Sequence, residues 1–192
     1  MNSSNTRQQP ALLVFAGPNG SGKSVLSRSF EIKGLYINAD EIKKHDSKIS
    51  DLDAAVEAES LREHCLSAKK DFTFETVLST SRNLDLIARA KNTGYSISSV
   101  FVLTADPKVN IFRIKTRVLN GGHDVPDDKV LSRYKKSLDN IPALTELSDE
   151  IYIFDNTEEP FIIYLKDNAG NDTYSVNKYW TKTQIASLIN AE

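Results

Sequence analysis

An eight-residue segment near the start of the chain combines glycines, a lysine and a serine in a spacing suited to phosphate binding. It reads Gly17-Pro18-Asn19-Gly20-Ser21-Gly22-Lys23-Ser24 and fits the pattern G-x-x-x-x-G-K-S/T at every position. Glycines let backbone N–H groups converge on phosphate oxygens, and a following helix adds the positive end of its dipole. We expect Lys23 to reach the β- and γ-phosphates and the Ser24 hydroxyl to bind Mg²⁺. The segment predicts a nucleotide-binding P-loop.

The rest of the sequence favours ATP as the nucleotide. A GTP-binding protein normally carries an Asn-Lys-x-Asp motif for the guanine base. The single Asn-Lys pair here, Asn177-Lys178, is followed by Tyr179-Trp180 instead. We therefore expect ATP together with Mg²⁺.

Four acidic side chains follow or interrupt apolar runs, where the carboxyl ends of parallel strands gather around a ligand. They are Asp40, Glu75, Asp106 and Asp155. Asp40 has the position of a base that accepts the proton of an acceptor hydroxyl, or alternatively of an N-cap for a helix over 41–45. Glu75 lies inside an apolar strand, where a charge needs a partner or an exposed edge.

The other two acids have simpler interpretations. Asp106 precedes Pro107 and fits a helix cap. Asp155 precedes Asn156 and fits a turn, although the run 151–155 also resembles the strand that supplies a metal-binding acid in many ATPases.

Basic side chains flank the turn Gly121-Gly122-His123-Asp124-Val125-Pro126. Two helices that carry arginines and are joined by a Gly-Gly hinge are typical of a lid, here about residues 113–136. We expect Arg117 and Arg133, on either side of the turn, to neutralise charge on a transferring phosphoryl group. Solvated helix faces are the alternative interpretation of these basic residues.

Short apolar runs alternate with helical patterns, which favours βαβ units and a mostly parallel sheet. The expected strands are 11–16, 34–39, 72–78, 95–103 and 151–154. The expected helices are 24–30, 41–45, 52–70, 83–92, 107–120 and 126–147. After residue 160 the pattern changes to a hairpin and a final helix, over about 161–190. The predicted fold is a three-layer α/β/α P-loop kinase with a five-stranded sheet plus this C-terminal addition.

The composition excludes several classes of protein. With 24 Lys and Arg against 26 Asp and Glu among 192 residues, the net charge is −2, so we expect neither nucleic-acid nor membrane partners. The polar leader 1–10 lacks the order of a signal peptide, and we expect it to be disordered before a single domain over 11–192. A lone Cys65 favours a reducing compartment, and we expect a cytoplasmic protein.

Together these features resemble the zeta-toxin family of P-loop kinases, over about residues 11–155. The resemblance rests on Gly17–Ser24, Asn38-Ala39-Asp40, Phe74-Glu75-Thr76 and the stretch from Arg117 through the Gly-Gly-His-Asp-Val-Pro turn to Leu138. It implies a kinase that transfers the γ-phosphoryl group of ATP to a UDP-activated amino sugar. In well-known members this acceptor is UDP-N-acetylglucosamine, and the kinase is the toxin of a toxin–antitoxin pair.

The resemblance also implies roles at matching positions. These are Asp40 as general base, Lys23 and Ser24 as the P-loop pair, Glu75, Thr76 and Arg82 on the substrate side, and Arg117 and Arg133 as phosphate-contacting arginines. The chain is shorter than the larger toxins and adds the hairpin near its C-terminus. A kinase of another small metabolite or nucleoside, and a non-catalytic ATP-binding module, share the same motifs.

Overall fold

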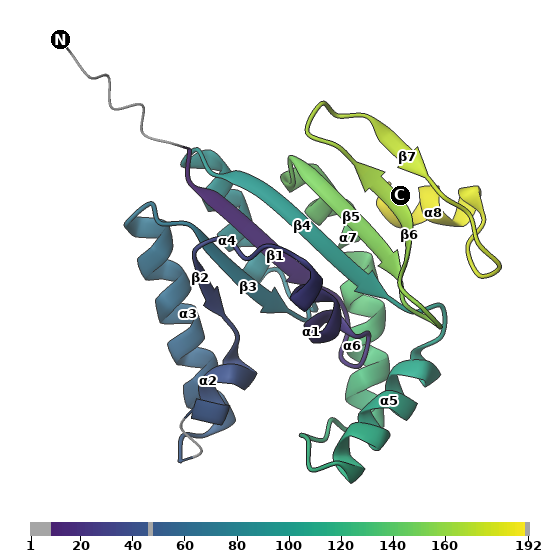
Figure 1. Cartoon of the computed structure of the whole chain (residues 1–192), viewed down its shortest axis with the longest axis horizontal. Coiled ribbons are helices and arrows are strands. Elements are labelled where there is room, and N and C mark those ends of the chain that lie inside the picture. The colour runs from purple at the N-terminus through teal and green to yellow at the C-terminus, as the bar shows by residue number, and fades with distance from the viewer. Residues whose placement is uncertain (1–8, 46–47, 191–192) are drawn as a thin grey trace.

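The computed structural model describes residues 9–45 and 48–190. Residues 1–8 of the expected leader lie outside the described residues. The described chain forms one seven-stranded sheet in the order β2-β3-β1-β4-β5-β6-β7 (Figure 1). Its strands are β1 (Ala11–Ala16), β2 (Leu35–Ile37), β3 (Phe72–Thr76), β4 (Ser96–Leu103), β5 (Glu150–Asp155), β6 (Phe161–Lys166) and β7 (Asp172–Tyr174).

The first five strands are parallel, as predicted. β1 lies at the centre between β3 and β4, while β2 pairs with β3 and β5 pairs with β4. β6 and β7 form the expected hairpin, but β6 also pairs antiparallel with β5. The hairpin therefore extends the sheet, which has seven strands in the described chain and not five.

The helices are α1 (Lys23–Leu26), α2 (Ala39–His45), α3 (Asp51–Ser67), α4 (Arg82–Asn92), α5 (Pro107–Leu119), α6 (Asp127–Asp139), α7 (Ile141–Leu147) and α8 (Lys182–Ile189). A 3₁₀ turn over 27–29 follows α1. The single helix predicted over 126–147 is wrong: it is split at Asn140, because Pro142 lacks an N–H donor and in one continuous helix its ring would clash with the carbonyl of Leu138. No helix in the described residues is long and apolar enough to cross a membrane.

Alternate residues of β1 point to opposite faces of the sheet and divide the core in two. Leu12 and Val14 join the larger apolar cluster, to which α3, α4, α7 and α8 contribute. Cys65 is 1% exposed within this cluster, which agrees with a packing role. Leu13 and Phe15 join a smaller cluster beneath the segment from α1 to Phe30. The sheet and the helices on its two faces are the three predicted layers. The layer that contains α1 is much thinner than the layer of α3, α4, α7 and α8.

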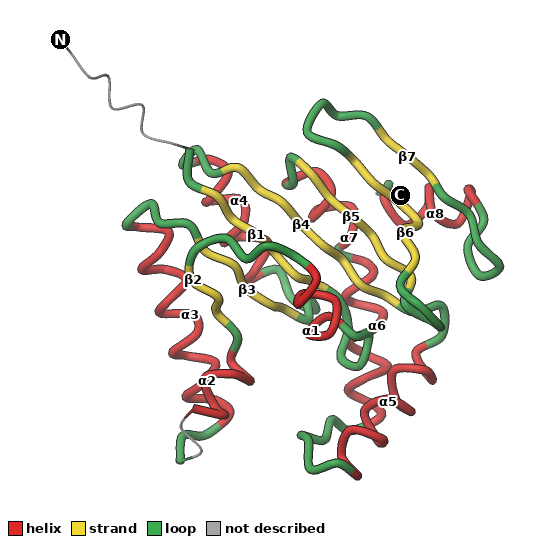
Figure 2. The backbone as a smooth tube through the Cα atoms, in the orientation of Figure 1, coloured by secondary structure: helices red, strands yellow, loops and turns green. Residues whose placement is uncertain are grey.

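The sheet brings several predicted site residues to one edge. The parallel strands β1, β2 and β3 end at Ala16, Ile37 and Thr76, so the residues that follow them meet there. α5 and α6 form a hairpin that extends past this edge, while α2 extends past it beside β2 (Figure 2). The backbone thus surrounds one region with the P-loop, α2 and the α5–α6 hairpin.

Candidate active site

The P-loop, Gly17–Ser24, connects the buried end of β1 to α1. Gly17, Gly20 and Gly22 have φ angles of 138°, 77° and 96°, a region that side chains disfavour. A Cβ on Gly17 would lie 2.1 Å from a β4 carbonyl oxygen, and one on Gly20 would lie 2.6 Å from an α5 carbonyl oxygen. The loop conformation therefore needs glycine at these positions.

Lys23 folds back over the P-loop. Its Nζ donates to the carbonyl oxygens of Gly17 (2.7 Å) and Pro18 (3.0 Å). Burial lowers the pKa of this lysine to about 8, although the nearby carboxylates of Glu75 and Asp40 oppose the effect. Lys23 is therefore charged at neutral pH and lies among groups able to position a phosphate.

Glu75 on β3 is the acceptor for a group of hydroxyl donors. Ser24 Oγ donates to it at 2.8 Å and Ser27 Oγ at 3.2 Å, and the Tyr36 hydroxyl is a third donor. Burial, with a smaller contribution from Glu75, raises the pKa of Tyr36 to about 12, so the phenol keeps its proton. Glu75 is therefore paired inside the site, where the exposed-edge interpretation does not apply.

Asp40 lies in the first turn of α2, and Asn38 occupies the capping position before it. The Asn38 Oδ1 atom accepts a hydrogen bond from the Asp40 backbone N–H at 2.9 Å. The capping role, which was the alternative interpretation of Asp40, is therefore taken by Asn38. Within the described residues the Asp40 carboxylate has no hydrogen-bond or ion-pair partner, and it borders the cavity next to the P-loop. Its acceptor atoms remain available to a ligand.

Two arginines of the α5–α6 hairpin reach the same cavity. Arg117 Nη2 donates to the carbonyl oxygen of His123 in the connecting turn at 2.6 Å. Arg133 Nη1 donates to Asn19 Oδ1 of the P-loop at 3.3 Å. Both side chains line the cavity together with Lys23, as expected for groups that neutralise phosphate charge.

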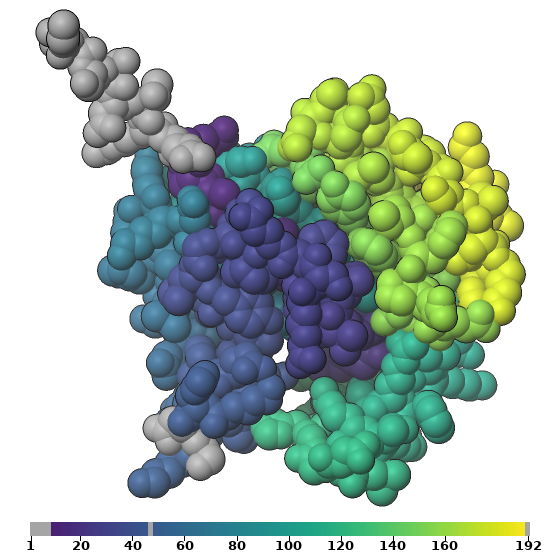
Figure 3. All heavy atoms as spheres, viewed as in Figure 1, coloured from purple at the N-terminus to yellow at the C-terminus, as the bar shows by residue number. Residues whose placement is uncertain are grey.

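The cavity has a volume of about 610 Å³ and brings together P-loop, β3, α2 and hairpin residues. Asp40 also borders two adjoining hollows of about 670 and 330 Å³, one beside α1 and one beneath the turn after α5. A hollow between the blue residues of α2 and the teal residues of α5 is visible in Figure 3. Asp40 therefore lies where three compartments meet.

The other two residues expected on the substrate side, Thr76 and Arg82, differ in their placement. Thr76 lines the cavity, but its hydroxyl oxygen accepts hydrogen bonds from the Leu78 N–H and Asn83 Nδ2. Arg82 does not line the cavity; it pairs with Glu59 on the surface at 2.9 Å. The structure therefore gives no contact that supports the expected substrate role of Arg82.

Two of the strand-end acids have structural roles. The Asp106 carboxylate caps α5 by accepting from the Lys108 N–H, as predicted. The Asp155 carboxylate accepts hydrogen bonds from Thr157 and Asn177 and does not border the cavity. The turn interpretation of Asp155 thus agrees with the structure, and its metal-binding alternative does not.

The cavity also includes residues that were not assigned to the site from sequence. Arg113 lies one helical turn before Arg117 and lines the same cavity, and this spacing is the signal that could have identified it. Its guanidinium donates to the carbonyl oxygens of Asn156 (2.8 Å) and Thr157 (3.3 Å). Asn156, directly after β5, does not line the cavity but donates from Nδ2 to the carbonyl oxygen of Ser21 in the P-loop at 2.7 Å. Nothing in its local sequence marks this contact.

The sequence of the chain matches a known protein family and a relative from another organism. The family model described as Zeta toxin matches residues 1–168. An uncharacterized protein of Haemophilus influenzae is 30% identical over 132 residues, which cover 66% of this chain and 94% of the relative.

Solved structures show the same fold at low sequence identity. One comes from the PezAT chromosomal toxin–antitoxin system of Streptococcus pneumoniae, with 17% identity, a TM-score of 0.61, and coverage of 98% of this chain and 86% of that chain. Another is the AvrRxo1-ORF1:AvrRxo1-ORF2 complex with sulphate ions, with 16% identity, a TM-score of 0.70, and coverage of 95% and 64%. The chain thus spans about two thirds of the AvrRxo1 chain.

Proposed function

The chain belongs to the zeta-toxin family of P-loop kinases, and from this premise we propose that it transfers the γ-phosphoryl group of ATP to a UDP-activated amino sugar. UDP-N-acetylglucosamine is the specific acceptor that we propose. The observation that carries the proposal is the Asp40 carboxylate, which has no partner in the described part of the chain and borders the same cavity as Lys23, Arg117 and Arg133. A base and a set of cations around one space are the parts that phosphoryl transfer to a hydroxyl requires.

Asp40 would accept a hydrogen bond from the attacking hydroxyl and then its proton as the new P–O bond forms. The bond between the γ-phosphorus and the β–γ bridging oxygen of ATP breaks in the same transfer, and ADP leaves. Lys23 would leave the carbonyl oxygens of Gly17 and Pro18 and bind the β- and γ-phosphates. Arg117 and Arg133 would stabilise the charge that spreads over the transferring group. The rate enhancement comes from positioning and electrostatics.

The residues beside Lys23 also fit Mg²⁺. Ser24 and Glu75 place a hydroxyl and a carboxylate oxygen 2.8 Å apart, and Mg²⁺ prefers oxygen ligands with few protein groups. We propose that the Ser24 hydroxyl would hold the ion and that the neighbouring Glu75 carboxylate would support it. Bound Mg²⁺ would neutralise phosphate charge, and Glu75 keeps Ser24 oriented toward it.

The same cavity has lining that suits an acceptor. Glu75, Thr76, Val77 and Ala55 line it together with Asp40 and the arginines. Their mixture of polar and small apolar surface suits a sugar that carries hydroxyl and acetamido groups. We also propose an antitoxin protein as a partner, because similar folds occur in the PezAT toxin–antitoxin system and in the two-protein AvrRxo1 complex.

Mass spectrometry of small-molecule products tests the proposal. Purified protein is incubated with ATP, Mg²⁺ and a panel containing UDP-N-acetylglucosamine, other nucleotide sugars, nucleosides and small hydroxy acids. We expect UDP-N-acetylglucosamine to gain the mass of one phosphate. If another panel member is phosphorylated and UDP-N-acetylglucosamine is not, that compound is the acceptor and the proposed one is wrong. The same incubation is repeated with a full metabolite extract, and ATP binding without any phosphorylated product there would refute the kinase activity.

The Asp40→Asn variant tests the proposed base. It should lose about 10²–10⁴-fold in turnover, because general base catalysis contributes that much, while ATP affinity stays within a few-fold of the parent. Asp85→Asn, on the exposed face of α4, is the matched control and should remain fully active. If Asp40→Asn reduces ATP binding as much as Lys23→Ala does, the base role is wrong.

A further inference from the structure

Two carbonyl groups of the P-loop are held from outside by side-chain amides. Asn110 Nδ2 donates to the carbonyl oxygen of Asn19 at 2.7 Å, and Asn156 Nδ2 donates to that of Ser21 at 2.7 Å. In a trans peptide the C=O and the next N–H point in opposite directions. The N–H groups of Gly20 and Gly22 are therefore directed away from these two amides.

Those two N–H groups are available to a phosphate. In the described part of the chain neither Gly20 nor Gly22 donates a backbone hydrogen bond, and both residues line the cavity. A hydrogen-bond donor fixed in advance binds an anion without reorganisation. Asn110 and Asn156 thus determine the direction of two phosphate-binding donors.

Asn156 is held in place by the short segment that follows β5, Asp155–Glu158. Its own N–H donates to the carbonyl oxygen of Leu103 at 2.8 Å. The neighbouring Asp155 side chain is 2% exposed and accepts from the Thr157 N–H at 3.0 Å and from the Thr157 hydroxyl. Thr157 Oγ1 in turn accepts from the Ala105 N–H at 2.8 Å.

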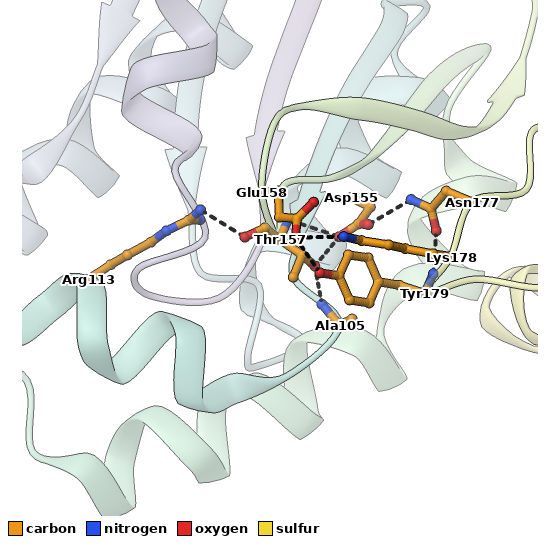
Figure 4. Close-up of polar contacts among 8 residues, drawn as sticks. All are labelled: Ala105, Arg113, Asp155, Thr157, Glu158, Asn177, Lys178 and Tyr179. Carbon is orange, nitrogen blue, oxygen red and sulfur yellow. Dashed lines mark hydrogen bonds and ion pairs between the residues drawn. The ribbon is translucent and has the colours of Figure 1, made fainter.

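The same segment contacts a part of the chain beyond the region that the family model matches. Asn177 Nδ2 donates to the second oxygen of Asp155 at 2.8 Å, whereas the family match ends at residue 168. Asn177 cannot easily turn away, because its Oδ1 accepts from the N–H groups of Tyr179 and Trp180, both at 2.9 Å. Figure 4 shows Asn177 and Thr157 converging on Asp155 from opposite sides.

A second contact joins the two regions. Lys178 Nζ and the Tyr179 hydroxyl both donate to the Glu158 carboxylate, at 2.7 and 2.9 Å. From the other side, Arg113 of α5 donates to the carbonyl oxygen of Thr157 (Figure 4) and to that of Asn156. The segment 155–158 thus contacts the P-loop, a cavity-lining arginine and the C-terminal region.

We propose that Asn177 and Asp155 are positioning residues for nucleotide binding. They fix the segment after β5, so that Asn156 aligns the Gly22 N–H and the Asn156 and Thr157 carbonyls hold Arg113. Neither residue touches the nucleotide. The proposal rests on the proposed function in one respect, that the P-loop cavity binds ATP.

The Asn177→Asp variant isolates the proposed contact. It keeps an oxygen that caps Tyr179 and Trp180 but replaces the donor facing Asp155 with a second carboxylate. We expect the dissociation constant of a non-hydrolysable ATP analogue with Mg²⁺, measured by calorimetry, to rise about tenfold, within the range for residues that act on a site through others. Asn171→Asp is the matched control, since Asn171 Nδ2 donates to Asp167 at 2.9 Å in the hairpin turn, and its affinity should be unchanged.

The reciprocal double variant Asp155→Asn/Asn177→Asp exchanges donor and acceptor and restores the hydrogen bond. It should fold even if Asn177→Asp does not, and it should bind the analogue within twofold of the parent. Parent affinity in a folded Asn177→Asp protein, or weak binding in the folded double variant, would overturn the proposal. The binding measurement needs no acceptor. The affinities of the parent and the variants can therefore be compared even if no phosphorylated product is found. An absence of ATP binding in the parent would overturn both.

Discussion

At the scale of single residues, Lys23 has partners that a phosphate must replace. Its ammonium group donates to two P-loop carbonyl oxygens in a part-buried position. Burial disfavours the charged form, whereas a bound polyphosphate favours it. The lysine should therefore bind a proton more tightly when ATP is present.

This change predicts a pH dependence of ATP binding. The pKa of Lys23 is about 8, so below pH 8 the lysine is already charged and binding requires no proton. Above pH 8 binding must take up a proton, and affinity should fall about tenfold per pH unit until the pKa of the complex is reached. Calorimetric titration between pH 7 and 9.5 measures this, and a constant affinity across that interval would contradict it. Lys23→Arg, which stays charged, should remove the dependence.

Glu75 supports a prediction about both stability and metal use. Removing its carboxylate in Glu75→Ala leaves the hydroxyls of Ser24, Ser27 and Tyr36 without their acceptor. We expect a loss of about 1–3 kcal/mol in the free energy of unfolding, measured with urea, and a higher Mg²⁺ concentration for half-maximal turnover. Glu57→Ala, exposed on α3, is the control; equal results for both variants would refute the role of this network.

Local motifs predicted part of the site, and packing decided the rest. The P-loop conformation follows from residues that are adjacent in sequence, and Arg117 and Arg133 follow from their places beside one turn. Arg82 could not be assigned in this way, because its partner Glu59 belongs to α3 and only the packing of α3 against α4 brings them together. Asn156 was missed for the same reason, since its contact with Ser21 spans 135 positions of sequence.

At the scale of elements, the turn between α5 and α6 controls the position of Arg117. A Cβ on Gly122 would lie 2.5 Å from Arg117 Cγ, while Gly121 has a φ of 82° and open space around it. The two glycines therefore have different roles: Gly121 ends α5 and Gly122 leaves room for the arginine.

The predicted effects of substitution differ accordingly. Gly122→Ala should displace Arg117 and lower kcat at least tenfold with little change in stability. Gly121→Ala should keep kcat but lose about 1–2 kcal/mol, because alanine is strained at positive φ. Gly170 in the β6–β7 turn has the same φ of 82° and open space around it. The loss of stability in Gly170→Ala therefore measures the cost of alanine at this φ away from the site. An equal fall in kcat for Gly121→Ala and Gly122→Ala would refute the contact with Arg117.

Most elements could be predicted because apolar runs and glycine turns mark them locally. The break between α6 and α7 was missed because proline is tolerated in the first turn of a helix, so Pro142 permits either one kinked helix or two. The extension of the sheet by β6 was missed because a hairpin signal says nothing about which other strand it pairs with. That choice depends on contacts between β5 and β6.

At the scale of the whole molecule, the cavity is formed by parts far apart in sequence. The P-loop follows β1, Asp40 begins α2, and the arginines come from α5 and α6. A ligand that contacts all of them stabilises the folded chain as a unit. The net charge of −2 conceals this local gathering of cations.

Thermal unfolding measures that coupling. ATP with Mg²⁺ at one hundred times its dissociation constant should add about 2.7 kcal/mol to the free energy of unfolding and raise the melting temperature by about 5–11 °C for a chain of this size. Asp40→Asn should show the same rise, because it retains ATP binding, and Lys23→Ala should show little. No rise in the parent protein at saturating ATP would contradict a site built from these elements.

The central place of β1 also has a consequence for the chain during its synthesis. β1 pairs on one side with β3, about sixty residues later (Leu12 with Phe72), and on the other with β4 (Ala11 with Ser96). At about 5–20 residues per second, the ribosome makes β1 on the order of ten seconds before β4 is complete. The phosphate loop therefore emerges long before the strands that hold it, and Arg133 emerges later still. A nascent chain would lack the complete site until most of it has left the ribosome, which would leave time for the proposed antitoxin to meet it first.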